Sequence, residues 1–231
     1  MSKFPTQSSV IEATLEGMSQ AQKNFLFWTN NRLSLSAGPQ KILSIHVAQA
    51  LSLIENAPEV FIDATVSDIL RCSLPNRKAF KTYMEKNALS QDVFSITLDE
   101  RFPHQNHNDS ISRVIITLKN GVCNAKAEYS YEIERLCKML HRKVEESSTL
   151  DYGIFAFYAD LSTSARKKLV KRLPDDIASF DEVVSHFPSL KASFVQTPVQ
   201  HVVDVGEWMA GKYRDWETGF PITYRYEFFR K

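Results

Sequence analysis

The first fifty residues place apolar side chains at the spacing of an α-helix. One stripe over residues 8–28 starts after serines able to cap a helix and contains Ile11, Leu15, Met18, Gln22 and Phe25. A second stripe follows the breaker SAGP over residues 40–56 and contains Leu43, Val47, Ala50 and Ile54. Most other positions of this second segment are also apolar, which predicts a helix buried on several sides.

Short alternating runs predict strands in the next part of the chain. Residues 58–66 form the first such run and residues 92–98 the second, with two short helical segments predicted between them. The dipeptide Asn120-Gly121 then separates two further strand-like runs, residues 112–118 and 124–130. Asn-Gly is the strongest short-range signal for a tight turn between antiparallel strands, so residues 112–130 are predicted to form a β-hairpin.

A helix and a buried strand are predicted to follow the hairpin. Residues 132–148 repeat apolar side chains at helical spacing, and residues 153–159 form the centre of a nearly continuous apolar run. A helix that joins one strand to another at this distance implies a parallel crossover and therefore a mixed sheet. The sequence predicts one α/β domain over residues 1–231, with helices on both faces of the sheet. Its core spans about residues 9–160, and residues 161–231 add helices and an aromatic-faced hairpin.

Charge, cysteine spacing and missing motifs restrict the kinds of function that the chain can have. The 28 Lys and Arg residues balance 27 Asp and Glu residues to a net charge of +1, so a nucleic-acid-binding surface has to be local. The three cysteines have no CxxC spacing, which favours reduced thiols and a cytoplasmic protein. The N-terminal residues lack an apolar leader and no window contains 18 uninterrupted apolar residues, so no membrane association is expected. Dinucleotide-binding, P-loop, α/β-hydrolase and zincin motifs are absent from the sequence.

The predicted element order is α-β-β-β-α-β, with a hairpin before the crossover helix. This order resembles the core of the restriction-endonuclease-like, or PD-(D/E)XK, superfamily. The resemblance implies a nuclease fold with an acidic residue near the start of the second core strand and Glu-x-Lys on the third. A glutamate of the first helix often joins them, and the site holds Mg²⁺, a hard cation that prefers oxygen ligands.

The resemblance assigns site residues only in part. Glu128 in KAEYS stands in the place of the family's glutamate, but Ser130 stands in the place of its lysine. Lys126 precedes Glu128 by two residues, on the same face of a strand, and is the candidate replacement. The second carboxylate for Mg²⁺ would come from Asp109, or from Glu12 or Glu16 in the first helix. These departures imply a catalytically impaired protein, with Mg²⁺ bound only if activity survives.

Other polar groups have two interpretations each. A hairpin with one polar face is the common antiparallel arrangement, so residues 124–130 need no function to explain them. His104 and His107 lie near Asp109 on a polar loop. They are interpreted either as metal ligands or as part of a solvent-exposed loop without a function. A basic segment over residues 165–173 is interpreted either as a phosphate-binding surface or as the solvent-exposed side of an amphipathic helix. Its candidate phosphate-binding residues are Arg166, Lys167, Lys171 and Arg172.

Two function classes follow from these patterns. The element order favours a restriction-endonuclease-like protein of DNA defence or processing that is catalytically impaired and acts as a DNA-binding or accessory subunit. The near-neutral charge favours a non-enzymatic interaction protein with no nucleic-acid role. The expected partners are accordingly DNA or another protein subunit.

Overall fold

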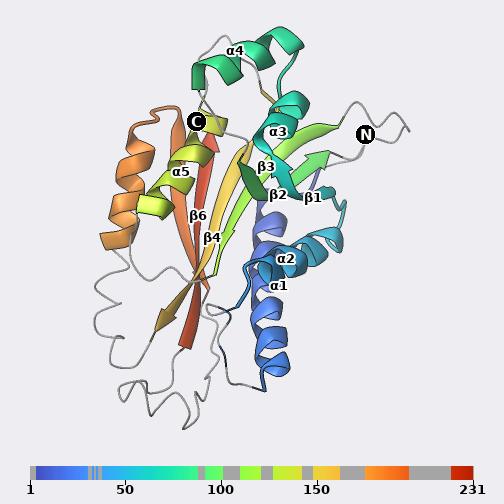
Figure 1. Cartoon of the computed structure of the whole chain (residues 1–231), viewed down its shortest axis with the longest axis vertical. Helices are drawn as coiled ribbons and strands as arrows, with labels where there is room; N and C mark the ends of the chain where they lie inside the picture. Colours follow the sequence, from blue (N-terminus) through green and yellow to red (C-terminus); the bar gives the residue numbers. More distant parts are fainter. Residues whose placement is uncertain are drawn as a thin grey trace.

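A six-stranded mixed sheet forms the centre of the protein (Figure 1). The computed structural model describes residues 4–30, 33, 35, 38–87, 92–100, 110–120, 127–141, 148–161 and 175–197, and the backbone of residues 220–230. The strands are β1 (Glu59–Thr65), β2 (Val93–Glu100), β3 (Ile111–Lys119), β4 (Tyr152–Leu161), β5 (Leu190–Thr197) and β6 (Phe220–Arg230). Their order across the sheet is β1-β2-β3-β4-β6-β5. Only β3 and β4 pair in parallel, and every other neighbouring pair is antiparallel.

Two N-terminal helices cover one face of this sheet. Helix α1 (Gln7–Trp28) begins at Thr6, whose hydroxyl accepts a hydrogen bond from the Ser9 amide, and α2 (Lys41–Ser52) packs against it. Their apolar stripes share a core with alternate residues of the central strands, among them Ile116 of β3. The predicted stripes of residues 8–28 and 40–56 therefore face the protein interior. The prediction that the second helix is buried on several sides is wrong, because Ile45, on the side of α2 away from the core, is 51% exposed.

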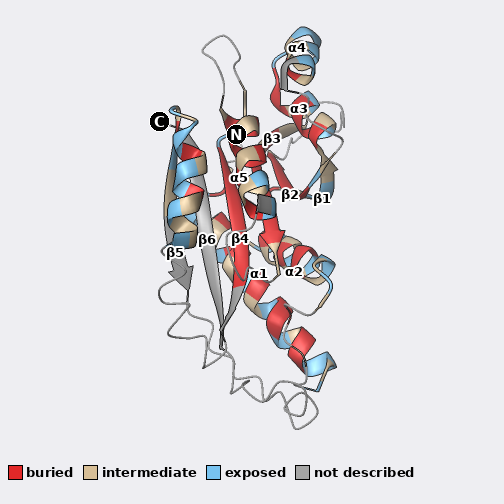
Figure 2. Ribbon diagram, turned by 60° about the vertical axis from the view of Figure 1, so that its left-hand side comes forward, coloured by how far each residue is buried: buried red, intermediate tan, exposed pale blue. Residues whose placement is uncertain are grey.

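The opposite face carries α3 (Val66–Ser73), α5 (Ala127–Leu140) and a helix over residues 175–185. Ile115, the neighbour of Ile116, belongs to this second core, because successive strand residues point to opposite faces. Phe155 of β4 packs against Phe157 and Phe180 with ring centroids 5.4 and 5.8 Å apart. Figure 2 shows buried residues along the central strands between the two layers. Helix α4 (Arg77–Asn87) joins α5 through a hydrogen bond from the Tyr83 hydroxyl to the Lys138 carbonyl.

The predicted α/β class and mixed sheet are confirmed. Residues 153–159 lie within buried strand β4, and the parallel β3–β4 pair is joined by a crossover that contains α5. The tail contains an antiparallel β5–β6 pair, as expected from residues 222–229. Within the described part of the chain, no helix is long and apolar enough to cross a membrane.

The predicted hairpin over residues 112–130 is wrong at residues 127–130, and residues 121–126 lie outside the described residues. The partner of β3 is β2, and α5 already begins at Ala127, five residues before the helix predicted from residue 132, and ends at Leu140. Tyr129 is buried together with Ile133, and this helical spacing overrides the strand-like alternation of the segment. The side chain of Asn120 donates hydrogen bonds to the carbonyls of Leu35 and Gly38, so it holds the α1–α2 connection.

Candidate functional site

Only some of the residues expected to form a site lie in the described structure. Glu12 and Glu16 are exposed on α1, on the face of the sheet opposite to α5. Glu128 lies in the first turn of α5 and not on a strand, so the structure does not bring it together with Glu12. Eight other candidates lie outside the described residues: His104, His107, Asp109, Lys126, Arg166, Lys167, Lys171 and Arg172.

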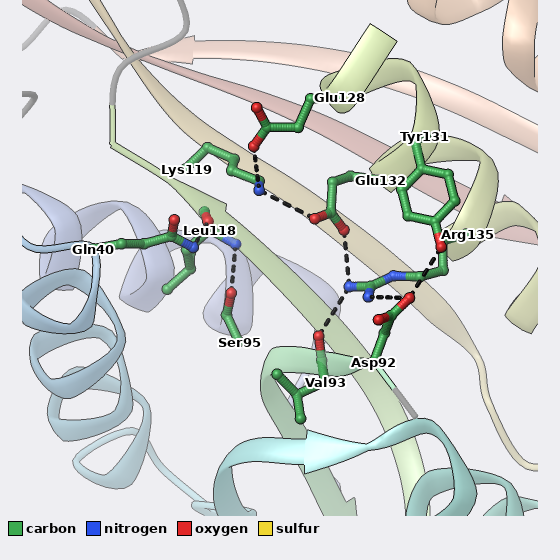
Figure 3. Close-up of polar contacts among 10 residues, drawn as sticks. All are labelled: Gln40, Asp92, Val93, Ser95, Leu118, Lys119, Glu128, Tyr131, Glu132 and Arg135. Carbon is green, nitrogen blue, oxygen red and sulfur yellow. Dashed lines mark hydrogen bonds and ion pairs between the residues drawn. The ribbon is translucent and has the colours of Figure 1, made fainter. Parts of the chain in front are cut away.

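Glu128 belongs to a chain of ion pairs at one end of the sheet, the charged ladder of Glu128, Lys119, Glu132, Arg135 and Asp92 (Figure 3). The Lys119 ammonium lies 3.1 Å from a carboxylate oxygen of Glu128 and 3.1 Å from one of Glu132. Arg135 Nη2 lies 2.8 Å from Glu132 Oε2, and Arg135 Nη1 lies 3.6 Å from Asp92 Oδ2. The two bases thus link three carboxylates in one continuous series.

Secondary structure brings these residues together from three segments. Lys119 is the last residue of β3, and Asp92 directly precedes β2. Glu128, Glu132 and Arg135 follow one another at intervals of four and three residues, which places them on one side of α5. The ladder therefore fastens the N-terminal half of α5 to the edge where β2 begins and β3 ends.

The β2–β3 pair is irregular at this edge. Regular pairing begins at Ile96 with Ile116 and continues to Leu98 with Val114. Beyond Ile96, the Leu118 amide donates to the Ser95 hydroxyl at 3.0 Å, and Arg135 Nη2 donates to the Val93 carbonyl at 2.9 Å. Side chains thus satisfy backbone groups that a regular ladder would pair with backbone.

Burial makes the inner part of the ladder energetically important. The side chain of Arg135 is 7% exposed and those of Lys119 and Glu132 are each 14% exposed, whereas that of Glu128 is 62% exposed. The Arg135 guanidinium also lies 4.2 Å from the centroid of the Phe94 ring, within the range of a cation–π interaction. A buried charge is tolerated only when it is paired, so Arg135 and Glu132 depend on each other.

The carboxylates of the ladder do not fit a resident Mg²⁺ ion as they are arranged. Arg135 contacts both Asp92 and Glu132, and Lys119 contacts both Glu132 and Glu128, so each carboxylate already has a cationic partner. In the ranges that the structure describes, no three Asp, Glu, His or Cys side chains are grouped as metal ligands.

An aromatic residue lies at the outer end of the ladder. The Tyr131 side chain is largely exposed, and its hydroxyl donates a hydrogen bond to Asp92 Oδ2 at 3.0 Å. Val93, beside Asp92, is also exposed. The accessible part of this site therefore combines carboxylates with an aromatic ring, while both bases lie beneath.

The described thiols provide no nucleophile. Cys137 is fully buried, and this burial, together with the nearby Glu134 charge, raises its pKa to about 12. Such a thiol stays protonated at neutral pH and is inert.

Sequence reasoning missed four members of the ladder: Asp92, Lys119, Glu132 and Arg135. The signal was present in the helical spacing of Glu128, Glu132 and Arg135, which becomes informative once residues 127–131 are assigned to a helix. The ends of β2 and β3 could be recognised as parts of the same site only from their pairing. Comparison of the chain with models of protein families, with curated proteins and with solved structures finds no match.

Proposed function

We propose that this chain is a restriction-endonuclease-like protein of DNA defence or processing that does not cleave DNA and acts as a DNA-binding or accessory subunit. The order of α1, β1, β2, β3, α5 and β4 supports this proposal, since it follows the α-β-β-β-α-β order of that superfamily once α2, α3 and α4 are treated as additions to the core. The pairing of these four strands as neighbours in one mixed sheet is compatible with it.

The corrected strand assignment improves the match to the family pattern. With β2 as the second core strand, Asp92 stands near its start, where the pattern has an acidic residue. With β3 as the third, Thr117-Leu118-Lys119 stands in the place of Glu-x-Lys. The lysine is therefore retained as Lys119, and the glutamate is replaced by Thr117. Glu132 of α5 approaches the same lysine from the helix.

The observation that carries the non-cleaving part of the proposal is the position of Arg135. Its guanidinium contacts Asp92 and Glu132, the two carboxylates that a catalytic cation at this position would have to share. A divalent ion would have to displace a buried, multiply bonded arginine to bind both. The ladder thus serves as a structural clamp between α5 and the sheet.

A plasmid-nicking assay tests this part of the proposal. The wild type and Lys119→Met are incubated with supercoiled plasmid and either Mg²⁺ or Mn²⁺. We expect neither protein to produce nicked or linear DNA beyond the buffer control, because the carboxylates remain bound to Arg135 and Lys119. Metal-dependent nicking by the wild type that is lost in Lys119→Met would show instead that the site is an active nuclease.

DNA binding is tested separately, with duplex and single-stranded oligonucleotides titrated at several salt concentrations. Binding that is measurable at about 50 mM salt and weakens steeply as salt rises is expected for a protein that contacts phosphates. Absence of binding to both oligonucleotides at that salt concentration would contradict the DNA-binding form of the proposal.

A second candidate is an interaction protein without a nucleic-acid role. Phe27 and Trp28 at the end of α1 are 81% and 59% exposed, which is unusual for large apolar side chains next to each other. Together with the net charge of +1, they favour a protein partner. If DNA binding is absent, replacement of Phe27 by serine should weaken any association seen by light scattering without changing the circular dichroism spectrum.

A further inference from the structure

Two carboxylates meet at the end of β2 opposite to the charged ladder. Asp99 of β2 and Glu59 of β1 are direct partners in the antiparallel register, so their side chains lie next to each other on the same face of the sheet. Asp99 is seven residues from Asp92, about 23 Å along an extended strand. This pair is therefore separate from the ladder and independent of the function proposed above.

The Asp99 carboxylate is buried and only half satisfied. The residue is 3% exposed. Its Oδ2 accepts a hydrogen bond from the Ser110 hydroxyl, and Ser112 adds a further side-chain hydrogen bond to the carboxylate. Its Oδ1 has no hydrogen-bond partner among the described residues. A buried carboxylate oxygen without a donor is costly and calls for a bound proton or cation.

An irregularity in β3 keeps a basic residue away from this pair. Leu98 pairs with Val114, so regular pairing would place Arg113 opposite Asp99. The register shifts between Leu98 and Asp99, and Ser112 takes that position instead. Arg113 binds Glu100, with Nη2 2.5 Å from Oε2, and approaches Asp151 at 3.8 Å. Among the described residues, no ion pair engages Asp99 or Glu59.

Helix α3 adds negative charge and hydroxyl groups. Asp68 acts electrostatically on Cys72 together with Asp99, and the only base of α3, Arg71, is exposed and lies 3.6 Å from Asp68. The buried hydroxyls of Ser73 in α3 and Thr97 in β2 have no partner among the described residues either.

The donor atoms gathered here are those that a hard cation prefers. Asp99 and Glu59 supply carboxylate oxygens, and Ser73 and Thr97 supply buried hydroxyl oxygens without a partner among the described residues. Burial raises the pKa of the nearby Cys72 thiol, which therefore stays protonated and is a poor metal ligand. Such a set of oxygens suits Mg²⁺, Mn²⁺ or Ca²⁺ better than softer metals.

We propose that Asp99 and Glu59 form a binding site for one hard divalent cation, with neighbouring hydroxyl groups and water completing its coordination. The cation would satisfy Asp99 Oδ1 and remove the repulsion between two directly opposed carboxylates. It would also tie β1, β2 and the C-terminal end of α3 together. The site needs no residue of the charged ladder, so its presence does not depend on whether the protein binds or cleaves DNA.

Mn²⁺ titration followed by electron paramagnetic resonance tests the site. We expect the wild type to bind one Mn²⁺ per chain, and Asp99→Asn and Glu59→Gln each to weaken this binding at least tenfold. Glu16→Gln, which removes an exposed carboxylate from α1, should bind as the wild type does. Wild-type binding that equals that of both site variants, or no binding to the wild type, would overturn the proposal. Glu59 is partly exposed, so Glu59→Gln decides the question even if Asp99→Asn does not fold.

Discussion

Replacing Arg135 with alanine is expected to lower the free energy of unfolding by about 3–5 kcal/mol, the cost typical of removing one partner of a buried ion pair. Among the described residues, the substitution leaves Glu132 with Lys119 as its only ionic partner, and it removes the hydrogen bond to the Val93 carbonyl. It also opens a gap against the Phe94 ring. Urea denaturation followed by circular dichroism measures the change, provided that the m-value stays constant.

The control for this prediction is Arg71→Ala in α3. Arg71 also forms an ion pair, with Asp68, but its side chain is exposed, so we expect a loss of only about 0.5 kcal/mol. A double-mutant cycle of Arg135→Met with Glu132→Gln should show that the two substitutions together cost less than the sum of the single effects. Similar small losses for Arg135→Ala and Arg71→Ala would mean that the ladder does not hold α5 to the sheet.

Much of the fold was predictable where one local pattern dominated. Residues 153–159 are apolar on both faces and become β4, which is buried on both sides between two helical layers. The stripe containing Met18 and the stripe containing Val47 were also correct, because both are long and regular. In these segments, burial and local periodicity favour the same structure.

The hairpin prediction failed because two short-range signals gave the wrong partner. Asn120-Gly121 suggested a tight turn, but the Asn120 side chain bonds the distant segment that joins α1 and α2. Residues 127–130 alternate like a strand, yet Tyr129 belongs to the helical series that packs on Phe155. The competing contacts are separated by many residues in the sequence, so no short window contains them.

The members of the charged ladder were not predictable from the sequence. Glu128 was expected on a strand with Lys126 as its lysine, but it lies on α5 and forms an ion pair with Lys119. Assigning Glu128 to a strand removed Glu132 from consideration, because residues four apart are separated by about 13 Å along a strand but by only about 6 Å along a helix. The pairing of Asp99 with Glu59 could not be predicted from the sequence either, because it depends on the register of β1 against β2.

Gly17 marks the closest approach of α1 to α2. A Cβ atom at this position would lie 2.5 Å from the Val47 Cα and 2.7 Å from the His46 carbonyl oxygen. Both are backbone atoms of α2, so no rotamer change can relieve the overlap. The two helices can approach this closely only because residue 17 has no side chain.

Gly17→Ala is therefore expected to destabilise the protein by about 3 kcal/mol, because α1 must move away from α2 and loosen the buried packing around Met18 and Val47. Helix propensity alone predicts the opposite, a gain of about 1 kcal/mol for replacing glycine within a helix. The sign of the change in urea denaturation thus distinguishes the two effects. Lys23→Ala, at an exposed position of the same helix, should stay within about 0.5 kcal/mol of the wild type. An increase in stability for Gly17→Ala would show that α1 and α2 do not pack as closely as described.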